Sequence, residues 1–586
     1  MSDPRTPNWP VMTIDAAHAL LTAPGAPFEI EERVIRGIAT RTWKNAPPTL
    51  RDVFLNGLRF RDREFLIYDD ERVTFDGFGR AALTLAHRLQ ADGVQKGDRV
   101  AVILRNLPDW PVCFWAGVLV GAIVTPLNAW WTGAELEYGL ADSGTKVAFV
   151  DDERLDRISE LLDKLPALEK VYVTRLAGDP PHAKVGRLED IIGSVNSWSS
   201  LPELALPQVP LDPDDDVTIL YTSGTTGKPK GALGTHRNMT SNIGASGIAA
   251  ARNFLRAGEP LPELDPTKTP QRCTLLVVPM FHATGLSATL APSLNAGGKI
   301  VLMRRWDAEP AMRLIERERV GSTGGVPTIA WQLIEHPARN KYDLSSLVTV
   351  SYGGAPSAPE LVRKITEVFP GSQPGNGWGM TETTATFTSH LGRDYSNRPD
   401  SAGPAAPVGE MQIRDPADGK AVLATGVVGE LWCKGPQVVK AYWNKPEATA
   451  ETFQNGWLRT GDLARIDDEG FLFIIDRAKD MLIRGGENIY CVEVENVLYD
   501  HPDVMDVALV GIAHKTLGEE PGAVVHLRPG GTATEAELRQ FVRSRLAGFK
   551  VPVQVAFWPE TLPRNANGKI MKSELKTVFA KKTEPE

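Results

Sequence analysis

Residues 221–231 have the sequence Tyr-Thr-Ser-Gly-Thr-Thr-Gly-Lys-Pro-Lys-Gly and continue an apolar run from Val217 to Tyr221. The apolar run predicts a β-strand, and the residues after it predict a loop that holds phosphate groups. Glycines let the backbone approach an anion closely, hydroxyl groups donate hydrogen bonds, and the two lysines supply positive charge. The alternative is a flexible surface hairpin, but two lysines and four Ser/Thr hydroxyl groups in one short turn favour phosphate binding.

The spacing in this loop differs from that of the P-loop nucleoside triphosphatases. Their motif has four residues between its two glycines and Lys-Ser/Thr after the second glycine. Here two residues separate Gly224 from Gly227, and Lys228 is followed by Pro229, which has no backbone N–H to donate. The sequence therefore predicts that the loop holds triphosphate in another way than through the first turn of a helix.

The eleven residues resemble, in this order, the nucleotide loop of the adenylate-forming superfamily. That superfamily comprises acyl-CoA synthetases, firefly-luciferase-like enzymes and the adenylation domains of peptide synthetases. Seven separated motifs in the family's order lie between residues 221 and 570, and together they resemble the acyl-CoA synthetase branch, which includes the fatty-acid–CoA ligases. The resemblance covers nearly the whole chain and is weakest in residues 1–47 and 254–272.

The resemblance implies a nucleotide site built from several segments. In the glycine-rich turn 377–383, two glycines admit a flat ring, Thr381 offers a hydroxyl to the α-phosphate, and Glu382 is a hard oxygen ligand for Mg²⁺. A plain turn followed by a helix cap is the alternative for this segment. Asp462 is implied to accept the ribose hydroxyls. The implied nucleotide-binding residues are Thr222, Ser223, Gly224, Thr225, Thr226, Gly227, Lys230, Gly353, Gly354, Ala355, Asn376, Gly377, Trp378, Gly379, Asp462 and Arg477.

A lysine near the C-terminal end, Lys569, lies on a glycine-containing loop. Such a lysine is more often a solvated charge. The match of residues 563–570 to the family's last motif nevertheless implies that Lys569 bridges the substrate carboxylate and the α-phosphate, where negative charge builds up. The implied catalytic residues are Lys569, Thr381, Glu382 and His282, with Glu382 as the metal ligand.

The acid pocket is expected where the segment Pro279-Met280-Phe281-His282 ends a strand. A buried histidine bonded to the backbone is the alternative for His282. Amino-acid-activating relatives have an Asp at this place for the substrate ammonium, so His282 disfavours a free amino acid as the substrate. The family commonly has Tyr at the position of Trp378, and the pocket shape is therefore expected to differ. The expected pocket residues are Phe281, His282, Gly285 and Trp378, and Gly285, Gly353, Gly354 and Ala355 are expected to leave room for a chain or ring.

The segment 476–480, Asp-Arg-Ala-Lys-Asp, joins a large unit to a small one. The resemblance implies that Lys479 is the hinge about which the small unit rotates, and that Gly485, Gly486 and Glu487 line the tunnel for the pantetheine of CoA. A plain β-turn is the alternative for the latter segment.

The implied function is that of an ATP-dependent acid–CoA ligase, with Mg²⁺ accompanying ATP and with CoA as co-substrate. The acid is predicted to be a medium- or long-chain fatty acid, with aryl acids next. Two alternatives stay open. One is an amide-forming or luciferase-like enzyme whose acceptor is not CoA, and the other is a non-catalytic nucleotide-binding protein.

The fold is predicted to be α/β, because β-rich runs alternate with helical periodicity up to about residue 400, a pattern typical of parallel sheets. Short β segments over about 405–476 predict a small β-barrel-like part. The large N-terminal domain is expected to span 1–476, followed by a small mobile α+β domain over 477–586. Residues 254–272 are predicted to be a polar insertion, with a surface loop as the default and a lid or partner contact as the alternative.

The composition excludes several classes of protein. The 586 residues carry a net charge of −9, so nucleic acid is not an expected partner. The four cysteines are far apart and form no metal motif, which favours a reducing cytoplasm. The most apolar run, residues 111–127, contains prolines and glycines and is not predicted to span a membrane. A homodimer is compatible with the sequence, which does not define the oligomeric state.

Overall fold

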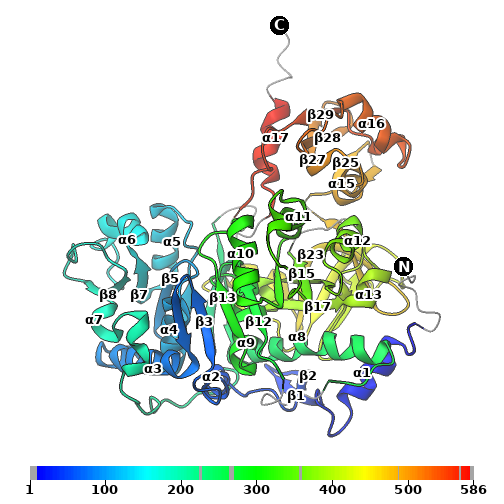
Figure 1. Ribbon diagram of the computed structural model, residues 1–586. Helices are drawn as coiled ribbons and strands as arrows, with labels where there is room; N and C mark the ends of the chain where they lie inside the picture. The colour runs from blue at the N-terminus through cyan, green and yellow to red at the C-terminus, as the bar shows by residue number, and fades with distance from the viewer. Residues whose placement is uncertain are drawn as a thin grey trace.

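The structure, a computed structural model, describes residues 9–222, 228–262, 269–354, 359–478, 480–485, 487–565 and 569–580. Two eight-stranded, mostly parallel sheets form the main body of these residues, and helices lie between the sheets and on their outer faces (Figure 1). The predicted α/β class is confirmed, because parallel strands connected by helices form sheets that are covered on both faces.

The first sheet has the strand order β21-β11-β10-β6-β5-β7-β8-β9 and is parallel except where β11 pairs with β10 and β21. Its strands are β5 (Arg99–Ile103), β6 (Ile123–Pro126), β7 (Thr145–Asp151), β8 (Lys170–Thr174), β9 (Val185–Arg187), β10 (Asp216–Thr222), β11 (Lys230–Thr235) and β21 (Ala441–Tyr442). The outer face buries leucines of α5 (Gly133–Ser143) and α6 (Asp152–Ile158). A capping box of Thr132 and Glu135 starts α5.

The second sheet has the order β17-β16-β15-β14-β12-β13-β3-β4 and is antiparallel only at its two ends. Its strands are β3 (Glu64–Tyr68), β4 (Glu71–Thr74), β12 (Cys273–Leu276), β13 (Lys299–Leu302), β14 (Ser322–Gly325), β15 (Thr349–Gly353), β16 (Gln373–Met380) and β17 (Ala385–Leu391). Its outer face packs against α10 (Ala308–Glu318), α11 (Pro327–Glu335) and α12 (Pro359–Val368).

The largest hydrophobic core lies between the two sheets and contains the buried indoles of Trp110 and Trp115. The helices that contribute to it are α2 (Leu50–Leu58), α3 (Phe75–Ala91), α4 (Asp109–Leu119), α8 (His236–Arg256) and α9 (Ala291–Ala296). The insertion expected over 254–272 begins later than predicted. Its first residues form the last turn of α8, where the buried Arg256 guanidinium pairs with Asp394 at 2.8 Å.

The β-rich region predicted after residue 405 is a six-stranded antiparallel sheet. Its strands are β18 (Gly403–Pro404), β19 (Glu410–Arg414), β20 (Gly429–Lys434), β22 (Phe453–Gln454), β23 (Trp457–Ile466) and β24 (Phe471–Arg477). Nine buried residues form its core, and Trp378 and Met380 at the end of β16 pack against that core. The end of β16 is therefore the place where this sheet meets the α/β body.

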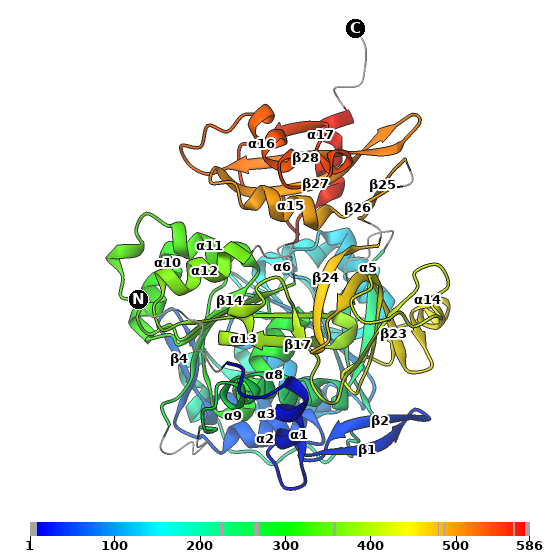
Figure 2. The same cartoon turned by 90° about the vertical axis from the view of Figure 1, so that its right-hand side faces the viewer.

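A small unit follows β24 and lies at one end of the molecule in both views (Figures 1 and 2). It contains a five-stranded sheet and three helices, α15 (Cys491–Tyr499), α16 (Glu535–Arg543) and α17 (Lys572–Ala580). Its strands are β25 (Leu482–Arg484), β26 (Glu487–Ile489), β27 (Val504–His514), β28 (Gly518–Leu527) and β29 (Gln554–Phe557). Arg528 of this unit contacts the large body, where its guanidinium lies 5.1 Å from the Trp331 ring centroid and pairs with Glu335.

The remaining α-helices and β-strands belong to no sheet or helix set described above. They are α1 (Ile14–Thr22), the hairpin β1 (Ile30–Ile35) and β2 (Ile38–Trp43), α7 (Glu189–Ile192), α13 (Gly392–Asn397) and α14 (Pro446–Thr452). Among the described helices, none has the length and the apolar composition required to cross a bilayer.

Candidate active site

The predicted phosphate loop connects two paired strands. Thr222 at the end of β10 faces Lys230 at the start of β11, and the Thr222 hydroxyl donates to the Lys230 carbonyl at 3.3 Å. Lys228 is exposed, and its ammonium lies 5.0 Å from the centroid of the Tyr138 ring on α5. The loop residues Ser223, Gly224, Thr225, Thr226 and Gly227 lie outside the described residues.

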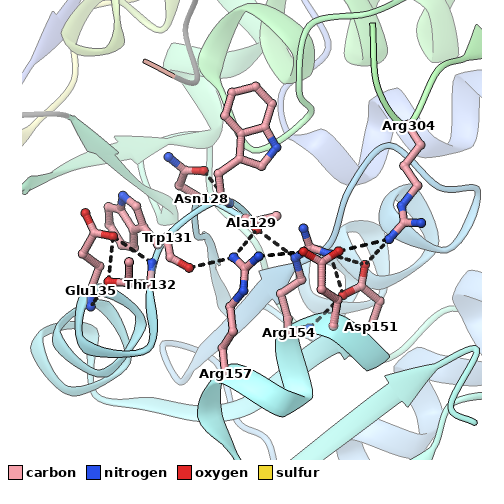
Figure 3. A network of polar contacts seen from close by, with 11 residues as sticks. Asn128, Ala129, Trp131, Thr132, Glu135, Asp151, Arg154, Arg157 and Arg304 are labelled. Atoms are coloured by element: carbon pink, nitrogen blue, oxygen red, sulfur yellow. Dashed lines mark hydrogen bonds and ion pairs between the residues drawn. The ribbon is translucent and has the colours of Figure 1, made fainter. Parts of the chain in front are cut away.

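A buried ion-pair network supports the chain beside this loop (Figure 3). Arg154 is fully buried and pairs with Asp151 at 3.0 Å, and its Nε donates to the carbonyl of Ala129 at 2.8 Å. The network fixes the turn 128–132, whose Trp131 ring lies 6.0 Å from the ring of Tyr221 at the start of the loop. This support was not predicted from the sequence, because Arg154 lies on α6, far from the loop in the chain, and leaves no local signal there.

The glycines predicted to face the nucleotide lie at adjacent strand ends. Gly353 pairs with Gly377 in parallel register, and a Cβ on Gly353 would lie 2.8 Å from the Gly377 carbonyl oxygen. The expectation that Gly353 leaves room is therefore corrected, since backbone fills that space. Gly354 is exposed with φ +73°, and nothing lies within 4 Å of its Cβ position. Ala355 lies outside the described residues. The carboxyl ends of parallel strands are where open α/β sheets bind ligands.

Trp378 joins the end of β16 to the predicted ribose carboxylate on β23. Its indole Nε1 donates to Oδ2 of Asp462 at 2.8 Å, and the Arg477 guanidinium pairs with Oδ1 at 3.2 Å. Asp462 is buried, and its backbone N–H is held by the Thr460 hydroxyl at 3.1 Å. The structure thus brings together three predicted nucleotide residues. The role of Trp378 as a wall of the acid pocket stays a prediction.

The predicted metal ligand is held by a tyrosine that was not predicted from the sequence. Glu382 is 5% exposed, and the hydroxyl of Tyr442 donates to its Oε1 at 2.6 Å. The ammonium of Lys230 lies 5.1 Å from the centroid of the same tyrosine ring. The predicted phosphate loop and the predicted metal ligand therefore share one neighbour. Thr381 starts the 3₁₀ turn that carries Glu382.

A single carboxylate fits Mg²⁺ at this place. No group of three or more acidic, His or Cys side chains forms a metal cage in the described part of the chain. Mg²⁺ commonly takes one or two carboxylates and completes its shell with water and substrate phosphates. Glu382 could hold it in this way if the phosphates lie beside Lys230.

Two other predicted residues of this region, Asn376 and Gly379, have structural contacts within the protein. The Asn376 side chain donates to the Ser401 carbonyl at 3.1 Å and accepts from the Gly377 N–H at 2.8 Å, so it fixes the strand end. A Cβ on Gly379 would overlap the Ala385 carbonyl oxygen at 1.6 Å, so only glycine fits where β16 meets β17.

Two of the predicted acid-pocket residues, Phe281 and His282, lie in the turn after β12. Phe281 is buried, and its ring lies 4.5 Å from the ring of the half-buried His282. A π-helix, Thr284–Leu290, follows, a feature common at functional sites. The expectation that Gly285 leaves room for substrate is corrected, because a Cβ there would lie 2.3 Å from the Pro279 carbonyl oxygen. The glycine lets this helix pack onto the preceding turn.

Lys569 lies on a short hairpin of the small unit. Asn565 N–H donates to the Lys569 carbonyl at 2.9 Å, and Lys569 N–H donates to the Asn565 side chain at 3.0 Å. The neighbouring Arg564 pairs with the buried Asp506 at 2.8 Å, and the Tyr499 hydroxyl also donates to Asp506 at 2.8 Å. The base of the lysine is therefore anchored to the core of the small unit.

The segment between the units is bonded on both sides. Ala478 N–H donates to the Gly461 carbonyl at 3.0 Å, and the buried Asp476 carboxylate accepts from the N–H of Arg477 at 2.8 Å and from that of Cys491. Burial raises the pKa of Asp476 to about 7. The predicted hinge residue Lys479 and Gly486 of the predicted CoA segment lie outside the described residues, while Gly485 and Glu487 are exposed.

Family models match most of the chain. One described as AMP-binding enzyme matches residues 55–443, and one described as AMP-binding enzyme C-terminal domain matches residues 493–569. The chain belongs to the AMP-binding enzyme family. The membership predicted from the motifs, in the adenylate-forming superfamily and its acyl-CoA synthetase branch, is confirmed.

Curated relatives of this AMP-binding enzyme have different substrates in their names. A long-chain-fatty-acid–CoA ligase of Bacillus subtilis is 34% identical over 88% of this chain and 92% of that protein. A feruloyl-CoA synthase of Amycolatopsis is 34% identical over 86% of this chain and 94% of that protein. A similar solved structure is that of o-succinylbenzoate coenzyme A synthetase from Bacillus subtilis, in complex with ATP and a magnesium ion. Its sequence is 30% identical to this chain, and the TM-score is 0.71. The match covers 89% of this chain and 99% of that one.

Proposed function

We propose that this AMP-binding enzyme is an ATP-dependent acid–CoA ligase that forms acyl-AMP and then acyl-CoA. The observation that supports it most is the placement of two buried carboxylates around the end of β16. Asp462, held by Trp378, suits a ribose, and Glu382, held by Tyr442 beside Lys230, suits a metal-bound phosphate. A nucleotide lying across residues 377–382 would meet both groups.

In the first step, a carboxylate oxygen of the acid attacks the α-phosphorus of ATP. The bond from that phosphorus to the bridging oxygen of the β-phosphate breaks, and pyrophosphate leaves with the electron pair. Lys569 and Thr381 stabilise the negative charge that develops on the α-phosphate, and Lys230 balances the charge of the leaving phosphates. Mg²⁺, held by Glu382, would supply further positive charge to the phosphates when bound.

In the second step, the sulfur of CoA attacks the acyl carbonyl carbon and forms the thioester bond, and the thiol proton passes to solvent. The bond from that carbon to the phosphate oxygen breaks, and AMP leaves with its electron pair. Lys569 is needed only in the first step, so rotation of the small unit about Lys479 would exchange it for the segment of Gly485, Gly486 and Glu487. His282, at the acid end, is proposed to lie next to the reacting carboxylate.

The proposed substrate is an acid with an apolar body, and medium- or long-chain fatty acids are favoured over aryl acids. The relatives named above include both a fatty-acid ligase and a feruloyl-CoA synthase. Phe281 provides an apolar side chain beside His282. The position of His282, where a substrate ammonium would need an acidic side chain, has none.

The same proposal divides the chain into residues 1–476 and 477–586, the second of which moves. ATP, the acid and CoA are its partners. A cytoplasmic location is proposed because the four cysteines are free thiols, all of them buried. A homodimer stays open.

The test is pyrophosphate release from ATP with a panel of fatty acids of graded length and aryl acids, each with and without CoA. Acid-dependent release with an acyl-CoA product supports the proposal. Acyl-AMP that is turned over by amines or oxygen but not by CoA would favour the alternative acceptor. Absence of ATP–pyrophosphate exchange with every acid would favour a non-catalytic nucleotide-binding protein.

A further inference from the structure

The indole of Trp378 connects two parts of the nucleotide site that come from different sheets. Trp378 lies on β16 of the α/β body, whereas Asp462 lies on β23 of the antiparallel sheet. The indole N–H donates to Oδ2 of Asp462 at 2.8 Å, and the ring edge packs against Phe387 with centroids 6.1 Å apart. The orientation of the carboxylate is therefore coupled to the strand end at the glycine-rich turn.

The second partner of Asp462 is less confined. Arg477 pairs with the other carboxylate oxygen at 3.2 Å, but its side chain is 39% exposed. Arg477 is the last residue of β24, directly before the segment between the two units. Trp378 is half-buried on β16 of the α/β body. An ionised carboxylate has about four acceptor positions. With one taken by the indole and one by the guanidinium, both oxygens retain capacity for further donors.

The hydrogen bond is not a general requirement for tryptophan in this protein. Within the described residues, the buried indole N–H groups of Trp110, Trp115, Trp198 and Trp432 have no hydrogen-bond partner. Packing alone thus accommodates a buried indole here. A phenylalanine at position 378 could supply the same apolar contact with Phe387, so the N–H directed at a buried carboxylate is the feature that requires tryptophan.

We infer that Trp378 is a positioning residue for ribose recognition. Its indole N–H holds the Asp462 carboxylate so that the remaining acceptor positions meet the 2′- and 3′-hydroxyls of ATP. Hydrogen bonds to a charged acceptor are strong and directional, so a carboxylate free to rotate would bind the diol less well. This inference rests on the proposed function, which assigns Asp462 to the ribose.

The test compares ATP with 2′,3′-dideoxyATP, which lacks both hydroxyls, in wild type and Trp378→Phe. Binding is measured by calorimetry, and the KM of each nucleotide is measured by acid-dependent pyrophosphate release. The variant is expected to bind ATP about tenfold more weakly and to bind dideoxyATP as wild type does. Equal weakening of the two nucleotides would assign Trp378 to ring stacking or to structure and would overturn the inference, as would an unchanged affinity for ATP.

Two further variants sharpen the comparison. Trp432 lies on β20 of the antiparallel sheet that also carries Asp462, and its indole N–H has no hydrogen-bond partner. Trp432→Phe is therefore expected to leave the preference for ATP over dideoxyATP unchanged. Trp378→Tyr keeps a large polar ring of the kind common in the family but has no N–H at the indole position. It is expected to reduce that preference as Trp378→Phe does, and full retention of the preference by both folded variants would contradict the inference.

The failure of the proposed function would look different. Wild type would then show no acid-dependent pyrophosphate release with any nucleotide. If wild type releases pyrophosphate and prefers ATP to dideoxyATP, but Trp378→Phe keeps that preference, only the inference about Trp378 fails.

Discussion

The hydroxyl of Tyr442 donates a hydrogen bond of 2.6 Å to Oε1 of Glu382, and both side chains are buried. Burial, together with the neighbouring Glu382 carboxylate, raises the pKa of Tyr442, so the phenol keeps its proton and remains a donor at neutral pH. The tyrosine therefore fixes one oxygen of the proposed metal ligand.

Tyr442→Phe removes this donor and keeps the ring. We expect the Mg²⁺ concentration for half-maximal pyrophosphate release to rise about tenfold, because residues that orient a metal ligand typically contribute that much to metal affinity. The measurement is a Mg²⁺ titration at saturating ATP and acid. Tyr172→Phe, which removes another tyrosine–carboxylate bond on β8, is the control and should not shift the titration. A normal Mg²⁺ requirement in Tyr442→Phe would contradict this role of the tyrosine.

Arg528 of the small unit contacts two residues of α11 in the large body. Arg528→Ala removes both the pairing with Glu335 and the stacking on Trp331, worth about 1 kcal/mol together at a partly exposed site. We expect a broader distribution of distances between the units, measured by double electron–electron resonance with spin labels on Asn340→Cys and Gln540→Cys. The four native cysteines are buried, so the introduced thiols are the reactive ones.

The control for this measurement is Arg545→Ala. The Arg545 guanidinium lies over Phe541 of the same small unit, 3.5 Å from the ring centroid, so its loss should leave the distance distribution unchanged. If Arg528→Ala gives the wild-type distribution, the contact does not influence the arrangement of the units.

The titration of Asp476, close to the predicted hinge, is expected to make the stability of the protein depend on pH. Its folded-state pKa of about 7 lies above the ordinary value of 3.8, mainly because of burial, while Lys572 acts in the opposite direction. The folded state therefore binds this proton more tightly than the unfolded chain does. The stabilisation from the protonated group is complete below about pH 4 and is lost as the pH rises to about 7.

Asp476→Asn removes this titration and keeps the shape of the side chain. We expect the free energy of unfolding of wild type to fall relative to that of the variant between about pH 4 and pH 7, by at most about 1.4 kcal/mol per pH unit. Denaturant unfolding of both proteins over this range gives the difference. A difference that stays constant with pH would show that Asp476 does not titrate in this window.

The sequence predicted the parts of the site that are local in the chain. The predicted phosphate loop, the glycine-rich turn and the predicted ribose carboxylate each carry their proposed chemistry within a few residues, and the α/β class followed from strands alternating with helices. The partners of these residues were not predictable. Tyr442 is 60 residues from Glu382 and reaches it from β21 of the first sheet. Trp378 is 84 residues from Asp462, and the two meet where the antiparallel sheet packs against the end of β16.

The glycines show a second limit of prediction from the sequence. Gly285 and Gly353 were expected to leave space for a substrate, but each one lets another stretch of backbone approach closely. A glycine that makes room for a ligand and a glycine that makes room for the chain look identical in the sequence. The difference lies in the register of β15 with β16 and in the packing of the π-helix on Pro279.

Lys569 is proposed to act only in the adenylation step, and the two half-reactions of Lys569→Ala test this role directly. Acyl-AMP formation from acid and ATP is measured by pyrophosphate release, and acyl-CoA formation is measured from supplied acyl-AMP and CoA. Lys576→Ala, an exposed lysine on the adjacent α17, is the control and should retain both. We predict that Lys569→Ala loses acyl-AMP formation by at least about 100-fold and keeps thioester formation. Equal loss of both half-reactions, or no loss of the first, would contradict the account.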